Sequence, residues 1–139
     1  MTSNGGLVET IFGVLGKNFS DKLIFAGVID PKAKLIHFQK GAYTLFLPID
    51  RQNALDVQLS LVCSLSQQLE DIGGKLAHTV LTFKDCEIVI LQVSAESVLY
   101  VICSRGSAAA ISHALSKLVN DVARFTGDDD YMEDEWSGR

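Results

Sequence analysis

The chain has 139 residues, of which 47% are hydrophobic and 2 are proline, so it is long enough for one domain with a buried core and too apolar for general disorder. Residues 127–139 hold six acidic side chains and one arginine, which accounts for the whole formal net charge of −5. Residues 1–126 are neutral and have no basic stripe, which argues against a nucleic-acid partner, and no apolar run approaches the roughly 18 residues of a membrane span.

The first predicted element is an amphipathic helix over residues 7–15. Its apolar side chains, among them Leu7, Ile11 and Leu15, recur at helical spacing on one side. Gly16 is expected near the end of this helix, because glycine readily adopts the backbone conformation that terminates helices.

A β-hairpin is predicted next. Residues 23–29 are continuously apolar, which is typical of a strand buried on both faces. Asp30 and Pro31 favour a type I turn, and apolar and polar side chains alternate in the returning strand, residues 35–40, so one face of that strand is expected to be solvated. A loop with several apolar side chains follows over residues 41–48.

A long helix is predicted over residues 51–72, with Asp50 as its N-cap and Gly73-Gly74 as its end. Apolar side chains fill an arc of roughly 200° of this helix, well beyond the roughly 100° that one contact surface needs. We therefore expect the helix to bury two surfaces, one against its own sheet and one against something else; the alternative is a deeply packed helix in a monomer. The polar side of the helix consists of Asn53, Asp56, Ser60, Gln67 and Asp71.

Three short strands follow, separated by turns too short to contain helices, so they must form an antiparallel meander. They are expected over residues 76–83, 86–93 and 98–104, and the second and third are apolar without alternation. A last helix is predicted over residues 108–125, with Ser107 as its cap. We interpret the loop around Arg105 as a plain connection, in preference to an anion site or an arginine finger.

These elements predict an α+β fold of the order αββαβββα. Hairpins pair the neighbouring strands, and the three continuously apolar strands should be central. The only strand order that satisfies both conditions is 2-1-5-4-3, a five-stranded antiparallel sheet covered by helices on both faces. The third strand then lies at an edge and lacks the charged side chains that normally protect edges. An unprotected edge beside an unusually apolar helix indicates a dimer interface, with Leu61, Leu65, Leu69, His78, Val80 and Leu81 as its candidate residues.

This order of elements resembles the roadblock domain of dynein light-chain type, in the wider roadblock/longin group. The resemblance covers roughly residues 6–126 and is one of pattern, since these families have no invariant catalytic motif. It implies dimers, with a second copy or with a paralogous roadblock chain, in which two sheets join into one. It also implies a Ras-like small GTPase as partner, which the protein activates or holds as a platform. The segments that carry the resemblance are Leu23–Asp30, the long helix, Gly73-Gly74, the meander to Cys103 and the stretch Ser107–Phe125.

On this resemblance, we expect the GTPase to contact the outer polar side of the paired long helices, at Asn53, Asp56, Ser60 and Gln67. The apolar loop at residues 43–47 is a second candidate. We expect no catalytic centre of the protein's own, and a cytoplasmic location with recruitment to a membrane or motor complex through partners. Two alternatives stay open, a small-molecule sensor domain of the profilin, PAS or GAF type and a longin-like trafficking adaptor.

Residues 127–139 lie outside the domain pattern and form an acidic C-terminal tail, which we expect to be disordered. The alternative is a short linear motif in which Tyr131, Met132 and Trp136 anchor in a groove while the acidic side chains steer the tail toward a basic partner. Trp136 is the only tryptophan of the chain.

Chemistry of other kinds has little support in the sequence. The three histidines, His37, His78 and His113, lie on separate elements without ligand spacing, so we expect no metal site and no cofactor. The chain has neither a P-loop nor a dinucleotide-binding glycine motif, and its N-terminal residues lack the pattern of a secretory signal. The three cysteines are interpreted as small buried thiols in a reducing cytosol: Cys63, Cys86 and Cys103.

Overall fold

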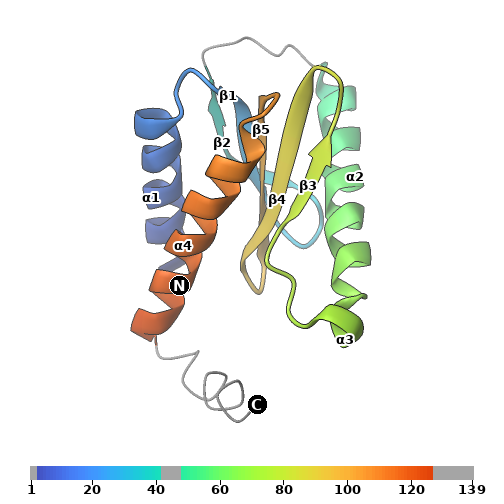
Figure 1. Ribbon diagram of the computed structural model, residues 1–139. Helices are drawn as coiled ribbons and strands as arrows, with labels where there is room; N and C mark the ends of the chain where they lie inside the picture. The colour runs from blue at the N-terminus through green and yellow to red at the C-terminus, as the bar shows by residue number, and fades with distance from the viewer. Residues whose placement is uncertain (1–2, 42–47, 127–139) are drawn as a thin grey trace.

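The computed structural model describes the backbone of residues 3–41 and 48–126 (Figure 1). In chain order its elements are α1 (Ser3–Asn18), β1 (Leu23–Ile29), β2 (Leu35–Lys40), α2 (Ile49–Gln67), the short α3 (Glu70–Gly73), β3 (Thr79–Thr82), β4 (Cys86–Ser94), β5 (Ser97–Ser104) and α4 (Ala108–Thr126). Within these ranges, no helix is both long and apolar enough to cross a membrane.

The five strands form one antiparallel sheet in the order β2-β1-β5-β4-β3, which confirms the predicted α+β fold and strand order. At the centre, Gly27 of β1 lies between Tyr100 of β5 and Phe38 of β2. A side chain at this position would meet Leu35 and the Tyr100 ring at 2.8–2.9 Å, so glycine is what allows the tyrosine to lie flat over β1.

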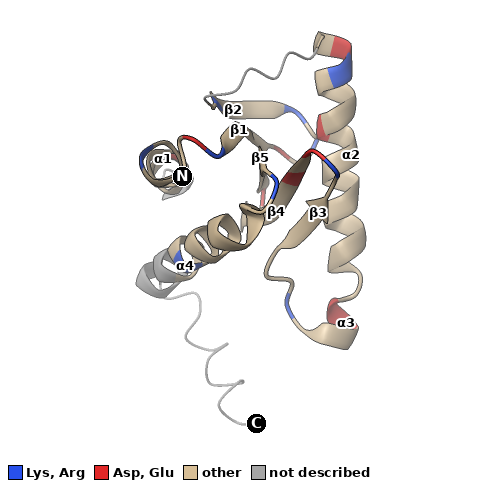
Figure 2. Cartoon of the chain, turned by 45° about the horizontal axis from the view of Figure 1, so that its top comes forward, with Lys and Arg blue, Asp and Glu red and all other residues tan. Residues whose placement is uncertain are grey.

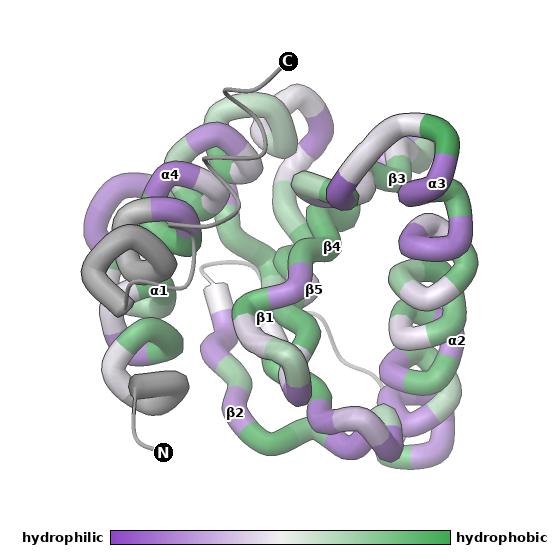
Figure 3. Tube along the Cα trace, turned by 90° about the horizontal axis from the view of Figure 1, so that it is seen from below, coloured by the Kyte–Doolittle hydropathy of each residue, from purple (hydrophilic) through white to green (hydrophobic). Residues whose placement is uncertain are grey.

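Helices cover both faces of the sheet. Figure 3 shows α1 and α4 on one side and α2 on the other. The core is accordingly split into two clusters, because side chains alternate between the faces along each strand. Between α1, α4 and the sheet lie Ile11, Leu15, Val89, Val101, Ile111 and Leu115, among others. Between α2 and the sheet lie Phe25, Ile29, Leu59, Cys63, Ile90 and Tyr100, among others.

Both ends of the first helix and both ends of the long helix differ from the sequence prediction, since α1 already begins at Ser3 and α2 ends at Gln67. The first helix, α1, continues to Asn18 through Gly13 and Gly16, because Leu15 is fully buried and its packing outweighs the low helix propensity of glycine. The long helix begins at Ile49, and its N-cap position is occupied by Pro48 instead of Asp50.

Local chemistry explains the start of the long helix. The Pro48 carbonyl accepts the first helical hydrogen bond from Gln52 N at 2.9 Å, and Asp50 lies in the first turn, where its charge suits the positive end of the helix dipole. At the other end, a turn at Gln68 and Leu69 separates α2 from α3, so the predicted helix 51–72 is in fact two. The edge strand β3 is also shorter than expected, since residues 76–78 precede it as an irregular segment.

Candidate interaction surfaces

The helix α2 has two apolar sides. Leu59 and Cys63 are buried against the sheet, whereas Leu61 and Leu65 are 56% and 61% exposed. The outward side chains continue beyond the helix into α3, and together they form what we call the α2 stripe: Val57, Leu61, Leu65, Leu69 and Ile72. The two surfaces expected from the wide apolar arc are therefore present, and one of them has no cover within the described residues.

The β3 edge borders α2. β3 pairs only with β4 in the described sheet, and its outward Val80 is partly exposed. Leu81 points the other way and packs in the cluster under α2, together with Leu55 and Val62. Figure 1 shows β3 running beside α2, so the open strand edge and the α2 stripe belong to one side of the molecule.

The six residues predicted for a dimer interface fall into two groups. Leu61, Leu65, Leu69 and Val80 are exposed, as an interface between copies requires. Leu81 and His78 are half-buried, and the buried Nδ1 of His78 has no hydrogen-bond partner among the described residues. Phe83, just beyond β3, is also exposed, at 50%.

The polar residues predicted as a GTPase contact do not share one exposed surface. Asp56 is only 1% exposed, so its assignment to an outer polar side is wrong. Its Oδ1 accepts hydrogen bonds from the Tyr100 hydroxyl at 2.8 Å and from Gln52 Nε2 at 3.0 Å, and Gln52 Nε2 also bonds the Tyr100 hydroxyl at 2.8 Å. Burial raises the pKa of Asp56, although the bonds from Tyr100 and Gln52 lower it in part.

The other three predicted contact residues lie along the same flank of α2. Asn53 is exposed, whereas Ser60 and Gln67 are half-buried. Gln67 donates from Nε2 to Gln92 of β4, which ties the end of α2 to the β4–β5 hairpin. Ser60 and Gln67 line a shallow hollow of about 200 Å³ whose other walls are the turn at Asp30 and the hairpin around Glu96.

A buried carboxylate holds the start of α4, and the sequence analysis did not identify it. Glu87 of β4 accepts hydrogen bonds at its Oε1 from the backbone N–H groups of Gly106 and Ala108, both at 2.9 Å. These bonds, that of Ala108 foremost, lower the pKa of Glu87 although burial opposes the change. The N–H groups considered for an exogenous anion are thus already satisfied by the chain itself.

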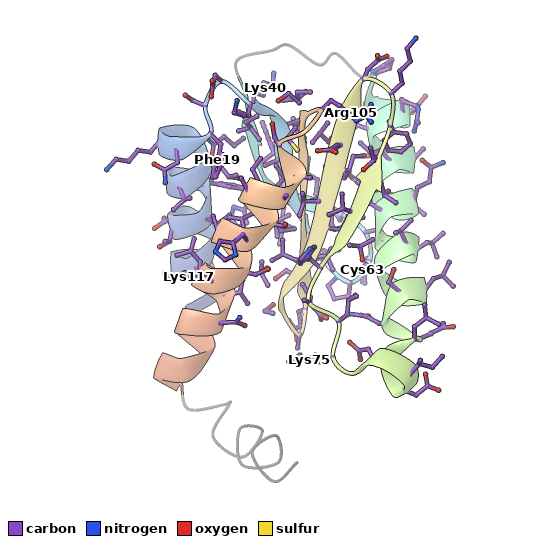
Figure 4. The ribbon with its side chains drawn as sticks, in the orientation of Figure 1. Phe19, Lys40, Cys63, Lys75, Arg105 and Lys117 are labelled. Atoms are coloured by element: carbon purple, nitrogen blue, oxygen red, sulfur yellow. The ribbon has the colours of Figure 1, made fainter. Side chains whose placement is uncertain are left out.

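Ser107 does not act as the predicted cap through its side chain. Its hydroxyl pairs with the Ser104 hydroxyl at 2.7 Å, and the Glu87 carboxylate takes the capping role. Arg105 donates from Nη1 to the Lys84 carbonyl at 3.3 Å, which joins the β5–α4 loop to the β3–β4 turn. In Figure 4, Arg105 lies at this end of the sheet.

The three cysteines are free thiols, and Cys63 and Cys103 are buried. Burial raises the pKa of Cys103 to about 12, so its thiol stays protonated at neutral pH. Across the described ranges, no three His, Cys, Asp or Glu side chains come close enough together to hold a metal ion. The loop 43–47 and the tail residues Tyr131, Met132 and Trp136 lie outside the described residues.

Known proteins resemble this chain in structure, whereas no match is found from the sequence. No protein-family model and no curated protein matches the sequence. Among solved structures, the gliding protein MglB from Thermus thermophilus aligns over 89% of this chain and 93% of its own, with 12% identity and a TM-score of 0.64. MglB from Myxococcus xanthus covers 93% and 98%, with 12% identity and a TM-score of 0.61.

A third similar solved structure is named as a Roadblock/LC7 domain. The Roadblock/LC7 domain from Streptomyces avermitilis covers 76% of this chain and 86% of its own, with 15% identity and a TM-score of 0.57. At such low sequence identity, the similarity to these three structures is a similarity of the backbone fold. The aligned part is at least 76% of this chain, so it includes helices as well as the sheet. The chain therefore has the roadblock-type fold.

Proposed function

We propose that the protein is a non-enzymatic, dimeric regulator or scaffold that binds a Ras-like small GTPase. The main observation in favour of a dimer is that the exposed α2 stripe lies beside the open β3 edge. We propose a GTPase as partner because the chain has the roadblock-type fold, which it shares with the gliding protein MglB. The three free cysteines suit the reducing cytoplasm in which this proposal places the protein.

The α2 stripe supplies the apolar area that association needs. Full burial of an exposed leucine side chain contributes about 1.5–3 kcal/mol, so Leu61 and Leu65, each more than half exposed, would contribute about 1 kcal/mol or more apiece. In a symmetric dimer every contribution counts twice, because the same residues face each other across the axis. Val57, Leu69 and Ile72 extend the stripe in both directions.

The charges on the two edge strands favour β3 as the edge that pairs. β2 carries Lys40 and follows directly on Lys34, and these positive charges discourage pairing between the β2 strands of two copies. β3 reads Thr-Val-Leu-Thr and has no charge. We therefore propose that β3 edges of two copies pair, while the two α2 stripes pack alongside.

The dimer is tested by sedimentation of the double variant Leu61→Glu/Leu65→Glu. Burying these charges at the interface should weaken association by at least about a hundredfold, so the variant should sediment as a folded monomer, since both side chains are exposed within one protomer. The matched control is Ile36→Glu on β2, which is 46% exposed and far from the proposed interface. A double variant that remains dimeric, or wild-type protein that is monomeric at micromolar concentration, would refute the interface.

For the GTPase, we propose contact on the flank of α2 that carries Asn53, Ser60 and Gln67, next to the hollow at the β4–β5 hairpin. Asp56 has no part in this contact because it is buried. The flank is polar and open beside the apolar stripe, so a GTPase bound there would contact the helix without competing for the stripe. The loop 43–47 stays a second candidate for this contact.

The partner is tested by titrating the protein with the Ras-like GTPases of its own source organism, each loaded with GDP or with a non-hydrolysable GTP analogue. We expect tighter binding to the GTP form, reduced at least about tenfold by Asn53→Arg/Ser64→Arg, since both side chains are exposed on this flank. His113→Arg/Asn120→Arg, exposed on α4, adds the same charge on the opposite face and serves as control. Absence of binding in both nucleotide states would overturn the GTPase proposal and leave the dimer untouched.

A further inference from the structure

β2 presents an apolar surface that nothing in the described structure covers. Ile36 is 46% exposed and Phe38 is 56% exposed. The Phe38 ring stacks on Phe25 with centroids 5.9 Å apart, and Phe25 in turn lies 6.1 Å from the buried Tyr100 ring. Phe38 is thus the outermost of three aromatic rings in a row across β5, β1 and β2, and its outer side faces solvent.

The stretch of chain around this strand carries an excess of positive charge. Residues 17–40 contain five lysines and two aspartates, whereas all other residues together contain seven basic and fifteen acidic side chains. Figure 2 shows the basic positions at both ends of β2.

The two aspartates of this stretch are already engaged. The Asp30 carboxylate accepts from the backbone N–H groups of Lys32 and Lys34, at 2.9 and 3.0 Å. Asp21 lies 4.0 Å from its neighbour Lys22, the one ion pair found within the described part of the chain. Lys34 and Lys40, which flank the exposed apolar side chains of β2, therefore keep charges that an acidic ligand can meet.

A surface of this kind suits an acidic segment with aromatic side chains. The open edge of β2 offers backbone groups, Phe38 and Ile36 offer apolar contact, and the lysines offer charge complementarity. Residues 127–139 of this chain have that composition, with six acidic side chains interleaved with Tyr131, Met132 and Trp136. Thirteen extended residues span at most about 45 Å. They start at the end of α4 on one face of the sheet, and since β2 is an edge strand they can pass around it to the face on which Phe38 stacks on Phe25.

We propose that residues 127–139 dock on the β2 surface, which is made of Lys34, Ile36, Phe38 and Lys40. Aromatic side chains of the segment cover Phe38, and its carboxylates lie against the two lysines. The segment then acts as an internal occupant of β2, and an acidic partner of the same chemistry must displace it. This docking requires neither the proposed dimer nor a GTPase, because both of its components belong to one chain.

Trp136 provides a direct test, since it is the only tryptophan and its fluorescence reports the segment alone. In the full-length protein we expect Trp136 emission at shorter wavelength than in the guanidinium-unfolded chain, with reduced quenching by acrylamide. Acrylamide is neutral, so the acidic segment does not repel it. Both signs of protection should fade as salt rises, because the lysine contacts are exposed and screened.

Charge-reversal variants locate the contact. Lys34→Glu/Lys40→Glu should abolish the protection of Trp136, and Phe38→Ser should reduce it while circular dichroism shows the fold intact. The matched control is Lys75→Glu/Lys117→Glu, which changes the net charge equally at two exposed lysines away from β2 (Figure 4). If Trp136 is as accessible in the native protein as in the unfolded chain, or if the control pair removes the protection as well, the proposal is wrong.

Discussion

Two buried carboxylates, Glu87 of β4 and Asp56 of α2, have pKa values shifted in opposite directions. Glu87 lies on the side of α4, where two backbone N–H groups at the start of that helix donate to it, and these favour its charged form. Asp56 belongs to α2 and faces the sheet, where burial disfavours its charge, and its donors are the neutral groups of Tyr100 and Gln52. At the residue scale, Glu87 thus stabilises the fold as an anion, whereas the burial of Asp56 costs free energy that its hydrogen bonds offset in part.

Replacing Glu87 by glutamine should destabilise the fold by about 1–2 kcal/mol at pH 7, since the charge-assisted bonds to Gly106 and Ala108 weaken. The folded pKa of Glu87 lies below its ordinary 4.5, so its contribution is complete above the unfolded pKa and is lost as the pH falls through the folded pKa. Urea unfolding at pH 7 and under acid conditions checks this: the deficit of Glu87→Gln should narrow in acid. The control Glu96→Gln, at an exposed turn, should hardly change the free energy of unfolding. If Glu87→Gln lowers the free energy of unfolding at pH 7 by an equally small amount, Glu87 does not cap α4.

Replacing Tyr100 by phenylalanine removes the hydroxyl that donates to Asp56 and leaves a buried carboxylate with fewer donors. We expect a loss of about 1–3 kcal/mol at pH 7, of which Asp56→Asn in the same chain should recover part, because a neutral amide is less costly to bury than a charge. The measurement is a double-mutant cycle by chemical denaturation. Strictly additive losses would show that the two side chains do not depend on each other.

At the scale of elements, the sequence was sufficient for the fold and insufficient for the polarity of α2. Continuous apolar runs and short turns predict five strands in the order that the structure confirms. From its polarity, Asp56 was expected on the solvent side of α2. It is buried instead because it accepts a hydrogen bond from Tyr100, which lies 44 positions away in the sequence. No local pattern reveals such a pairing, just as none reveals that Glu87 reaches the start of α4. The exposure of Leu61 and Leu65, by contrast, agrees with the excess width of the apolar arc.

Two glycines give opposite predictions for their elements. At Gly13 in α1, a Cβ would meet nothing within 4 Å, so Gly13→Ala should stabilise the protein by about 0.5–1 kcal/mol through helix propensity. At Gly41, just after β2, a Cβ would lie 1.7 Å from the Leu23 carbonyl oxygen, so Gly41→Ala must push β2 away from β1 and destabilise the hairpin. Thermal unfolding of the two variants side by side measures both effects; equal shifts in the melting temperature would contradict the packing at Gly41.

At the scale of the whole molecule, the two faces of the sheet are unequal. α1 and α4 close one face with a large cluster, whereas the single helix α2 covers the other and leaves its own stripe outside. The edges differ as well, since β2 is basic and β3 uncharged. This asymmetry suits the two proposals made above, in which a second copy binds at α2 and β3 and residues 127–139 bind at β2.

Association of two copies should also change the thermal stability of the protein, which can be measured without detecting the dimer itself. If folding and association are linked, the melting temperature must rise with protein concentration, because a second copy binds the folded chain and not the unfolded one. Calorimetry over about a hundredfold range of concentration should show this rise for the wild type and for Ile36→Glu. Leu61→Glu/Leu65→Glu should melt at a lower temperature that no longer depends on concentration, since both side chains are exposed within one chain and their replacement leaves the protomer's core intact. A wild-type melting temperature that stays constant over this range would mean that the α2 stripe faces solvent or a different protein, and that a second copy is not its partner.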